Sequence, residues 1–308
     1  MNARHEIDLA QPAGLATPAT GVSGAPDAAS LTATGAGVRL QHKTLLQATS
    51  AEFQAGQVTV ILGPNGAGKS TFMSLLTGQR APSEGQVRMA GRALQDCPAQ
   101  ELARYRAFVA QETQVAFDFT VREVVELGRY PHRRRPSPVE IGIPDLAMQA
   151  TAVEHLADRP LNTLSGGEKA RVHLARALAQ VWESPADLTG HRTRWLLLDE
   201  PTAALDLRHQ HRMLLLARRW ADVHGVGVVA VLHDLNLALR YSDRCLVLQD
   251  GQLVASGLTG DVLTPQRISD VWDVVAHPVS LPAVQPEACG LAGKPPVRQY
   301  LFEARAGD

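Results

Sequence analysis

Three short segments of the chain are almost entirely apolar: residues 58–62, 195–198 and 226–232. Runs of this length, rich in Val and Leu, are typical of parallel strands in a sheet that is covered on both faces. Between the second and third runs, residues 207–224 predict a crossover helix. The pattern therefore predicts an α/β fold.

The remaining pattern predicts further helices and short strands. Amphipathic spacing indicates helices at 120–129, 144–156 and 167–182. Short strands separated by turns at Gly56, Gly85 and Gly91 are expected in the first third of the chain, and another strand at 108–110. The strands expected at 245–249 and 252–254 flank Asp250 and Gly251, a pair that favours a β-hairpin. Residues 183–194 are polar and predict a loop.

The two ends of the chain differ from its middle. Residues 1–35 are mostly Ala, Pro, Gly, Thr and Ser, and such a segment buries too little apolar surface to offset its ordering entropy. We therefore predict a disordered N-terminal tail at 1–35, one globular domain at 36–275, and an irregular, Pro-rich extension at 276–308.

Composition narrows the class of protein. The 308 residues carry a formal net charge of −1, so no overall field attracts the chain to nucleic acid or an anionic membrane. The three cysteines form no C-x-x-C pair, which favours reduced thiols over a disulfide framework or a zinc site. No segment approaches the roughly 18–20 apolar residues that span a bilayer, and no signal peptide is expected. If the protein acts at a membrane, another chain must supply the spanning helices.

A glycine-rich segment follows the first apolar run and precedes an expected helix. It has the spacing G-x-x-x-x-G-K-[ST] and consists of Gly63, Pro64, Asn65, Gly66, Ala67, Gly68, Lys69 and Ser70, followed by Thr71. Backbone N–H groups in such a loop and the positive end of the helix bind phosphates. Lys69 can reach the β- and γ-phosphate oxygens, and the Ser70 hydroxyl can bind Mg²⁺. The segment predicts a P-loop nucleotide site.

A P-loop alone does not separate a kinase, a GTPase and an ATPase. The apolar run at 195–198 ends in Asp199 and Glu200. Asp199 is placed to hold Mg²⁺ through its water shell. Glu200, one residue further on, can polarise a water molecule aimed at the γ-phosphate. This pair favours nucleotide hydrolysis.

A second anion-binding element is predicted at the start of the helix near residue 167. Ser165 is a good N-cap, and Gly166 and Gly167 allow close backbone approach. Because one P-loop already holds the nucleotide within the chain, this helix end is best explained if it faces the γ-phosphate bound by another copy. A kinase or a GTPase would leave the element unexplained.

Taken in order, these motifs resemble those of the ATP-binding subunits of ABC transporters. The resemblance covers residues 38–264 and rests on 63–70, Gln111, 164–168, 196–200, 204–206 and His233. It implies a RecA-like P-loop NTPase core, an antiparallel β subdomain, and a helical subdomain inserted at about 112–185. It also implies a head-to-tail homodimer that closes on two ATP molecules with Mg²⁺.

The resemblance also implies roles for single residues. His233 would contact the γ-phosphate and hold the attacking water with Glu200. Gln111 would touch Mg²⁺ and report the nucleotide state to the helical subdomain, and Asp206 would lie across the dimer interface. One departure from the family pattern is that no aromatic residue lies at 40–42, where the family stacks adenine, so selectivity for ATP over GTP is expected to be modest.

Within the family, residues 128–133, 164–183 and 196–211 most resemble ATPases of bacterial hemin importers, neighbours of the iron–siderophore and cobalamin importers. This implies two permease subunits, an indirect link to a periplasmic substrate-binding protein, and a peripheral place on the cytoplasmic face of the inner membrane. A rival is a soluble ABC ATPase in DNA repair or translation, but the chain shows neither a long coiled-coil insertion nor a second nucleotide domain. We expect the helical His209 and His211 to be solvated rather than to bind hemin.

Overall fold

The computed structural model describes residues 30–111, 118–134, 136–183, 193–279 and 299–304. The predicted tail before residue 30, most of the predicted loop at 183–194, and Cys289 lie outside the described residues. The strands are β1 Ser30–Leu40, β2 Lys43–Gln54, β3 Val58–Leu62, β4 Glu84–Met89, β5 Arg92–Ala93, β6 Arg106–Val109, β7 Trp195–Asp199, β8 Gly227–Val231, β9 Arg244–Gln249, β10 Gln252–Leu258, β11 Val274–Val279 and β12 Gln299–Ala304. The α-helices are α1 Lys69–Leu76, α2 Ala99–Leu102, α3 Val121–Glu126, α4 Ile143–Ala150, α5 Gly166–Gln180, α6 Leu207–His224, α7 Leu235–Tyr241, α8 Thr259–Val262 and α9 Pro265–Trp272.

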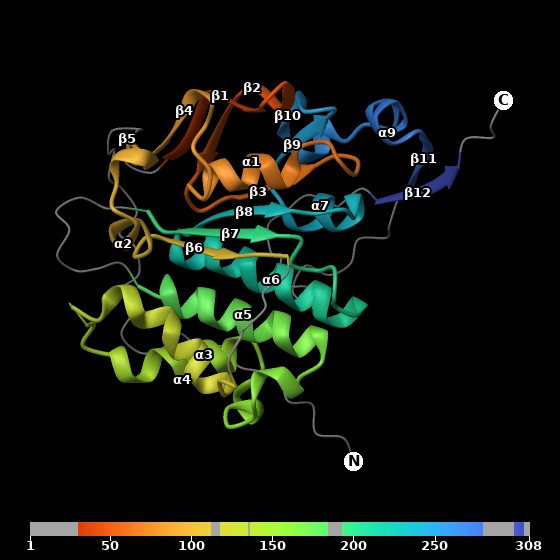
Figure 1. The fold of residues 1–308 in the computed structure, drawn as a ribbon. Helices are drawn as coiled ribbons and strands as arrows, with labels where there is room; N and C mark the ends of the chain where they lie inside the picture. Colours follow the sequence, from red (N-terminus) through yellow and green to blue (C-terminus); the bar gives the residue numbers. More distant parts are fainter. Residues whose placement is uncertain (1–29, 112–117, 135, 184–192, 280–298, 305–308) are drawn as a thin grey trace, which may run out of the picture.

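A six-stranded sheet forms the centre of the molecule (Figure 1). Its order is β10-β9-β3-β8-β7-β6, and every neighbouring pair except β10–β9 is parallel. The apolar runs of the sequence are its inner strands, and β3, β7 and β8 are buried along their whole length. The parallel sheet that the sequence predicted is confirmed.

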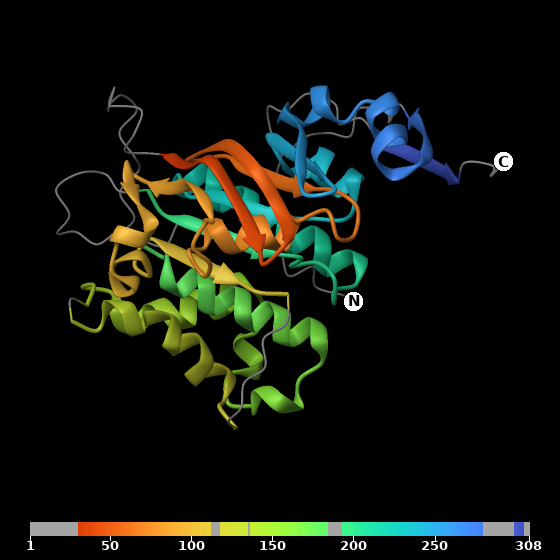
Figure 2. The same ribbon diagram turned by 45° about the horizontal axis from the view of Figure 1, so that its top comes forward.

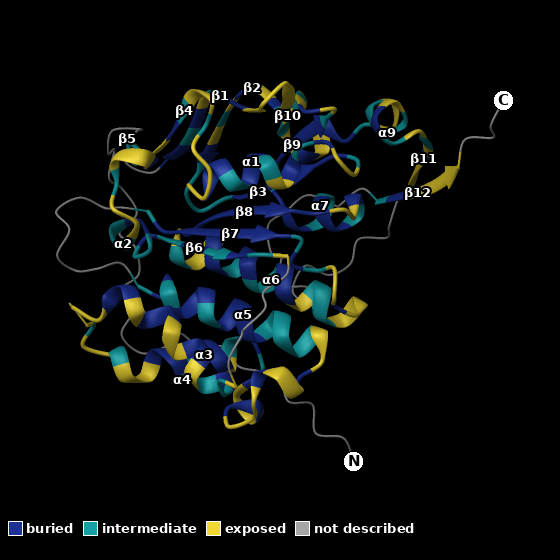
Figure 3. Ribbon diagram, in the orientation of Figure 1, coloured by how far each residue is buried: buried dark blue, intermediate teal, exposed yellow. Residues whose placement is uncertain are grey.

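Successive residues of these strands pack alternately into two separate cores. In β3, Val60 faces the core built with α3, α5 and α6, whereas Ile61 faces the core built with α1. In β7, Leu198 and Leu197 divide in the same way. Because successive side chains of a strand point to opposite faces, continuous apolar runs are what a sheet covered on both sides requires. Figure 3 shows these strands buried between the two layers.

An antiparallel sheet covers one side of this arrangement. Its order is β2-β1-β4-β5, and α1 lies between it and the central sheet (Figures 1 and 2). Phe53 of β2 and Phe72 of α1 meet in the shared core, with ring centroids 6.3 Å apart. Helix α1 is therefore fixed from both sides, and so is the P-loop that leads into it.

Helices α3, α4 and α5 form a helical layer on the other side (Figure 1). All three lie between Gln111 and β7, where the inserted helical subdomain was expected. Helix α4 ends at Ala150, before the predicted end at 156, because Ala152 adopts a left-handed φ of 54°. The predicted hairpin is confirmed as β9–β10, with positive φ at both Asp250 and Gly251, as a type I′ turn requires.

Two predicted boundaries are wrong within the described residues. Residues 30–35 belong to β1, not to a tail, because β1 pairs with β2 on one side and with β4 on the other. Leu31 and Ala33 are buried there, so these residues belong to the core of the domain. The extension at 276–308 is not wholly irregular, since β11 pairs with β12 through residues 274–279 and 299–304. Within the part of the chain described above, no helix has both the length and the apolar character needed to cross a bilayer.

Helix α5 buries a histidine that has no hydrogen-bond partner among the described residues. His173 is 5% exposed, and neither ring nitrogen is bonded. Burial lowers the pKa of His173 to about 4, and the nearby charges of Arg176 and Lys169 act in the same direction. An unfolded histidine has a pKa of about 6.5. Between the two pKa values, the unfolded state therefore binds a proton that the folded state does not bind.

The free energy of unfolding is therefore expected to fall as the pH drops below about 6.5, by about 2 kcal/mol between pH 7 and pH 5 from His173 alone. His173→Leu should remove this loss, whereas His155→Leu, at an exposed position, should leave it in place. Urea unfolding of the three proteins at a series of pH values measures the effect. If the free energies of unfolding of wild type and His173→Leu differ by the same amount at pH 7 and at pH 5, His173 is not the source of the pH dependence.

Candidate nucleotide-binding site

The P-loop joins the end of β3 to the start of α1 and borders a pocket of about 460 Å³. Strands β3, β8, β7 and β6 are neighbours and run parallel, so the residues after each of them meet at one edge of the sheet. In sheets of this kind, ligands bind at the carboxyl ends of the strands. Of the predicted residues, Asn65, Gly66, Gly68, Lys69, Ser70, Thr71 and Glu200 line the pocket.

Two glycines of the loop are required by geometry. A Cβ on Gly63 would lie 2.1 Å from the carbonyl oxygen of Leu248 in β9, so only glycine fits there. Gly68 caps α1 with a left-handed φ of 97°, which disfavours a side chain. The loop can thus turn sharply and present its backbone N–H groups to an anion.

Lys69 is 5% exposed and lies beneath the loop. Its ammonium donates hydrogen bonds of 2.9 Å to the carbonyl oxygens of Gly63 and Pro64. Burial lowers the pKa of Lys69, while Glu200 and Asp199 raise it. This cation is therefore held at the loop beside two carboxylates, where a phosphate oxygen can bind it.

Asp199 and Ser70 converge at the same edge. The Ser70 hydroxyl donates to Asp199 Oδ1 over 3.4 Å. Burial raises the pKa of Asp199, and the neighbouring Glu200 adds to the rise, whereas Ser70 and Lys69 lower it. A hydroxyl and a carboxylate are oxygen donors of the kind that Mg²⁺ prefers, so these residues fit the ion.

Glu200 leaves the strand in a different direction from Asp199. It has a positive φ of 50°, which is unusual for a residue with a side chain. Its Oε2 accepts a hydrogen bond of 2.7 Å from Gln111 Nε2, and its Oε1 lies 2.6 Å from His233 Nε2. The structure therefore brings together three residues that follow β6, β7 and β8 and that are far apart in the sequence.

The remaining predicted residues lie away from this pocket in the same chain. Ser165 caps α5 in a capping box with Glu168, whose N–H donates to Ser165 Oγ over 3.3 Å. Ser165 and Gly166 are exposed. Asp206 caps α6, accepts from His209 N–H at 2.9 Å, and has a side chain that is 67% exposed. One chain thus carries a phosphate pocket and, outside its lining, a glycine-rich helix start that is exposed at Ser165 and Gly166.

Some residues that line the pocket were missed by the sequence analysis. Lys43, Thr44 and Leu45 of β2, with Asp250 and Gly251 of the β9–β10 turn, complete its wall. Gly251 is bonded to the P-loop through its N–H, which donates to Ala67 O over 3.2 Å. The D-G turn was visible in the sequence, but its place beside the P-loop depends on the pairing of β9 with β3.

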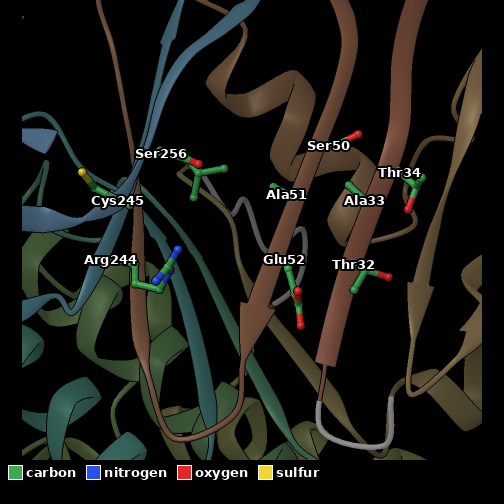
Figure 4. Close-up of a pocket in the computed structure, with 11 residues that line it drawn as sticks. Thr32, Ala33, Thr34, Ser50, Ala51, Glu52, Arg244, Cys245 and Ser256 are labelled. Atoms are coloured by element: carbon green, nitrogen blue, oxygen red, sulfur yellow. The ribbon is translucent and has the colours of Figure 1, made fainter. Parts of the chain in front are cut away.

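A second pocket, of about 430 Å³, lies between β1–β2 and β9–β10. Figure 4 shows polar side chains around it, with Thr32 and Glu52 on one side and Arg244 and Ser256 on the other. It contains no glycine-rich turn at a helix start. The pocket at the P-loop is therefore the candidate nucleotide site.

Comparison with known proteins agrees with this geometry. The model of the ABC transporter family matches residues 46–203. "Hemin import ATP-binding protein HmuV" of Gloeobacter violaceus is 49% identical over 80% of this chain and 90% of its own length. The proteins of the same name from Methylobacillus flagellatus and Escherichia coli O157:H7 are 46% and 41% identical, over 77% and 76% of this chain and 87% and 88% of theirs.

Solved structures show the same fold. A dimeric bacterial ABC transporter cassette matches with a TM-score of 0.64 and 27% identity, covering 74% of this chain and 98% of the cassette. A metal-chelate type ABC transporter in an inward-facing conformation matches with a TM-score of 0.71 and 23% identity, over 90% of this chain and 98% of its own. The chain therefore belongs to the ABC transporter family, as one of its ATP-binding subunits.

Proposed function

We propose that this chain is the ATP-hydrolysing subunit of a complex that imports hemin across the bacterial inner membrane. One observation supports hydrolysis most directly: Glu200 lines the P-loop pocket and is held between Gln111 and His233. The cargo is proposed from the names of the relatives at 41–49% identity, which are hemin import proteins.

The residues predicted for the nucleotide site have separate tasks in this proposal. The loop N–H groups from Gly63 to Thr71 and the Lys69 ammonium bind the phosphates of ATP. Ser70 and Asp199, with Gln111, would hold Mg²⁺, which when bound offsets the charge that develops on the phosphates. Glu200 accepts a proton from the attacking water, and His233 orients Glu200 and contacts the γ-phosphate.

The exposed start of α5 completes the site of a second copy. Ser165, Gly166 and Gly167 would face the γ-phosphate held by the partner's P-loop, with Asp206 at the interface. Support comes from their separation from the pocket of their own chain and from the similarity to a dimeric cassette. Two ATP molecules would then be enclosed between two copies.

The complex needs partners that this chain does not supply. Two permease subunits would provide the membrane path, and a periplasmic binding protein would deliver the cargo to them. The ATPase would sit on the cytoplasmic face of the inner membrane, and no nucleic acid takes part. An iron–siderophore or cobalamin importer is the alternative, since the same ATPase chemistry serves any of these cargoes.

The cargo is tested by reconstituting the chain with its permease in liposomes. Binding protein loaded with hemin, added on the side opposite the ATPase, is expected to raise ATP hydrolysis and to deliver hemin to the side of the membrane that carries the ATPase. A ferric siderophore or cobalamin should leave hydrolysis at its basal rate. A complex with Lys69→Ala should show neither response. Stimulation by a siderophore or by cobalamin, with no response to hemin, would contradict the hemin assignment while leaving the ATPase assignment intact.

A further inference from the structure

The C-terminal strand β12 lies outside the central sheet, next to α7 (Figures 1 and 2). It pairs with β11, and most of its residues are exposed, including Leu301 at 65% and Phe302 at 42%. Tyr300 is the exception, with 3% exposure. The strand is therefore attached to the body of the protein chiefly through Tyr300.

All three polar groups of Tyr300 are bonded to the body. Its hydroxyl donates to Leu263 O over 2.9 Å. Its backbone N–H donates to Asn236 Oδ1 over 2.8 Å, and its carbonyl oxygen accepts from Asn236 Nδ2 over 3.0 Å. The Asn236 amide thus offers the donor and acceptor that a neighbouring strand would offer.

The register between β11 and β12 explains why the backbone N–H and carbonyl groups of Tyr300 are available to Asn236. Tyr300 lies opposite Pro278 of β11, and proline has no N–H to give to a ladder. In an antiparallel pair, residues alternate between bonding their partner and pointing outward. The backbone of Tyr300 points outward, toward α7.

Asn236 lies in the first turn of α7, three residues after His233. Asp234, between them, caps the helix, and its Oδ1 accepts from the N–H groups of Asn236 at 2.7 Å and Leu237 at 2.9 Å. The His233 side chain is 46% exposed, and its Nε2 lies 2.6 Å from Glu200 Oε1, so little packing surrounds it. Its position against Glu200 is therefore set by the backbone that enters α7.

A helix as short as α7, with seven residues, depends on tertiary contacts for its stability. The Asn236–Tyr300 pair is such a contact, at the end of the helix that directly follows His233. We propose that Asn236 is a positioning residue, which locks β12 onto α7 and so fixes His233 against Glu200. The inference rests on the catalytic roles proposed for Glu200 and His233.

The test compares Asn236→Ala with Tyr300→Phe in the full chain. Asn236→Ala removes both bonds to the strand and should lower kcat for ATP hydrolysis roughly ten- to hundredfold, because small misplacements of reacting groups have effects of this size. KM for ATP should stay within about twofold, since the P-loop pocket is unchanged. Tyr300→Phe keeps the bonds to Asn236 and should keep kcat within about twofold of wild type.

A third variant provides a rescue. Asn236→Asp keeps an acceptor for the Tyr300 N–H but sets a carboxylate against the Tyr300 carbonyl, and protonation restores a donor there. Its kcat relative to wild type is expected to be low at pH 8 and to rise as the pH falls to 5.5. Hydrogen exchange at the Tyr300 amide should be faster in Asn236→Ala than in wild type.

Two results would overturn the inference. One is an unchanged kcat in Asn236→Ala although the Tyr300 amide exchanges freely. The other is a parallel loss of ATP binding and hydrolysis in Asn236→Ala, which would indicate a structural role alone. Neither result concerns Glu200, whose own variant tests the proposed function separately.

Discussion

Replacing Glu200 by Gln is expected to lower the rate of ATP hydrolysis by roughly two to four orders of magnitude while ATP still binds. Glutamine keeps the size and the hydrogen-bonding reach of the side chain but cannot accept a proton from water, and general-base catalysis contributes about 10²–10⁴ in rate. Gln111 and His233, which hold the carboxylate at 2.7 and 2.6 Å, should still contact the amide. Steady-state hydrolysis and binding of a fluorescent ATP analogue measure the two effects.

Lys69→Ala is the matched control, because it should weaken ATP binding, which Glu200→Gln should leave intact. Loss of a charge-assisted hydrogen bond of about 1.5–3 kcal/mol should weaken ATP binding roughly ten- to hundredfold. Only the Glu200 variant should therefore bind ATP normally and fail to turn it over. If Glu200→Gln hydrolyses ATP at the wild-type rate, Glu200 is not the base.

Ser165→Arg should abolish most hydrolysis without weakening ATP binding by a single chain. Ser165 caps α5, is exposed, and lies outside the P-loop pocket of its own chain. A bulky cation there would block the approach of the partner's γ-phosphate to the helix start. Losing the backbone N–H donors of the helix start should lower the rate of hydrolysis roughly a hundredfold or more. The measurement is hydrolysis as a function of protein concentration, together with ATP binding at low concentration.

Glu154→Arg supplies the control for this variant. Glu154 is exposed in the same helical subdomain but does not belong to the start of α5, so the same new charge should leave hydrolysis unchanged. Full activity in Ser165→Arg would mean that the helix start does not act on a neighbouring copy.

The sequence was sufficient where structure depends on local pattern. The apolar runs at 58–62 and 195–198 are inner strands, 207–224 is α6, and Asp250-Gly251 is the turn of a hairpin. In each case the period of apolar residues or the turn chemistry determines the element. The P-loop spacing likewise predicted a pocket that the structure contains.

The sequence was insufficient where structure depends on distant pairing. Residues 30–35 resemble a tail in composition, but they become an inner strand because β2 and β4 bond to both sides. Strand β12 depends on its pairing with β11 and on bonds from Tyr300 to Asn236 and Leu263, all distant in the sequence. The contribution of Asp250 to the nucleotide pocket follows from strand order in the sheet, which no local pattern contains.

The central claim is that two copies enclose ATP between the P-loop of one and the start of α5 of the other. Sedimentation velocity of Glu200→Gln with ATP and Mg²⁺ tests it most directly. The account predicts a species of twice the 33.1 kDa chain mass, which disappears without nucleotide and when Ser165→Arg is added. A single-chain mass in solution under these conditions, together with only one copy of this chain in the complex with the permease, would contradict it.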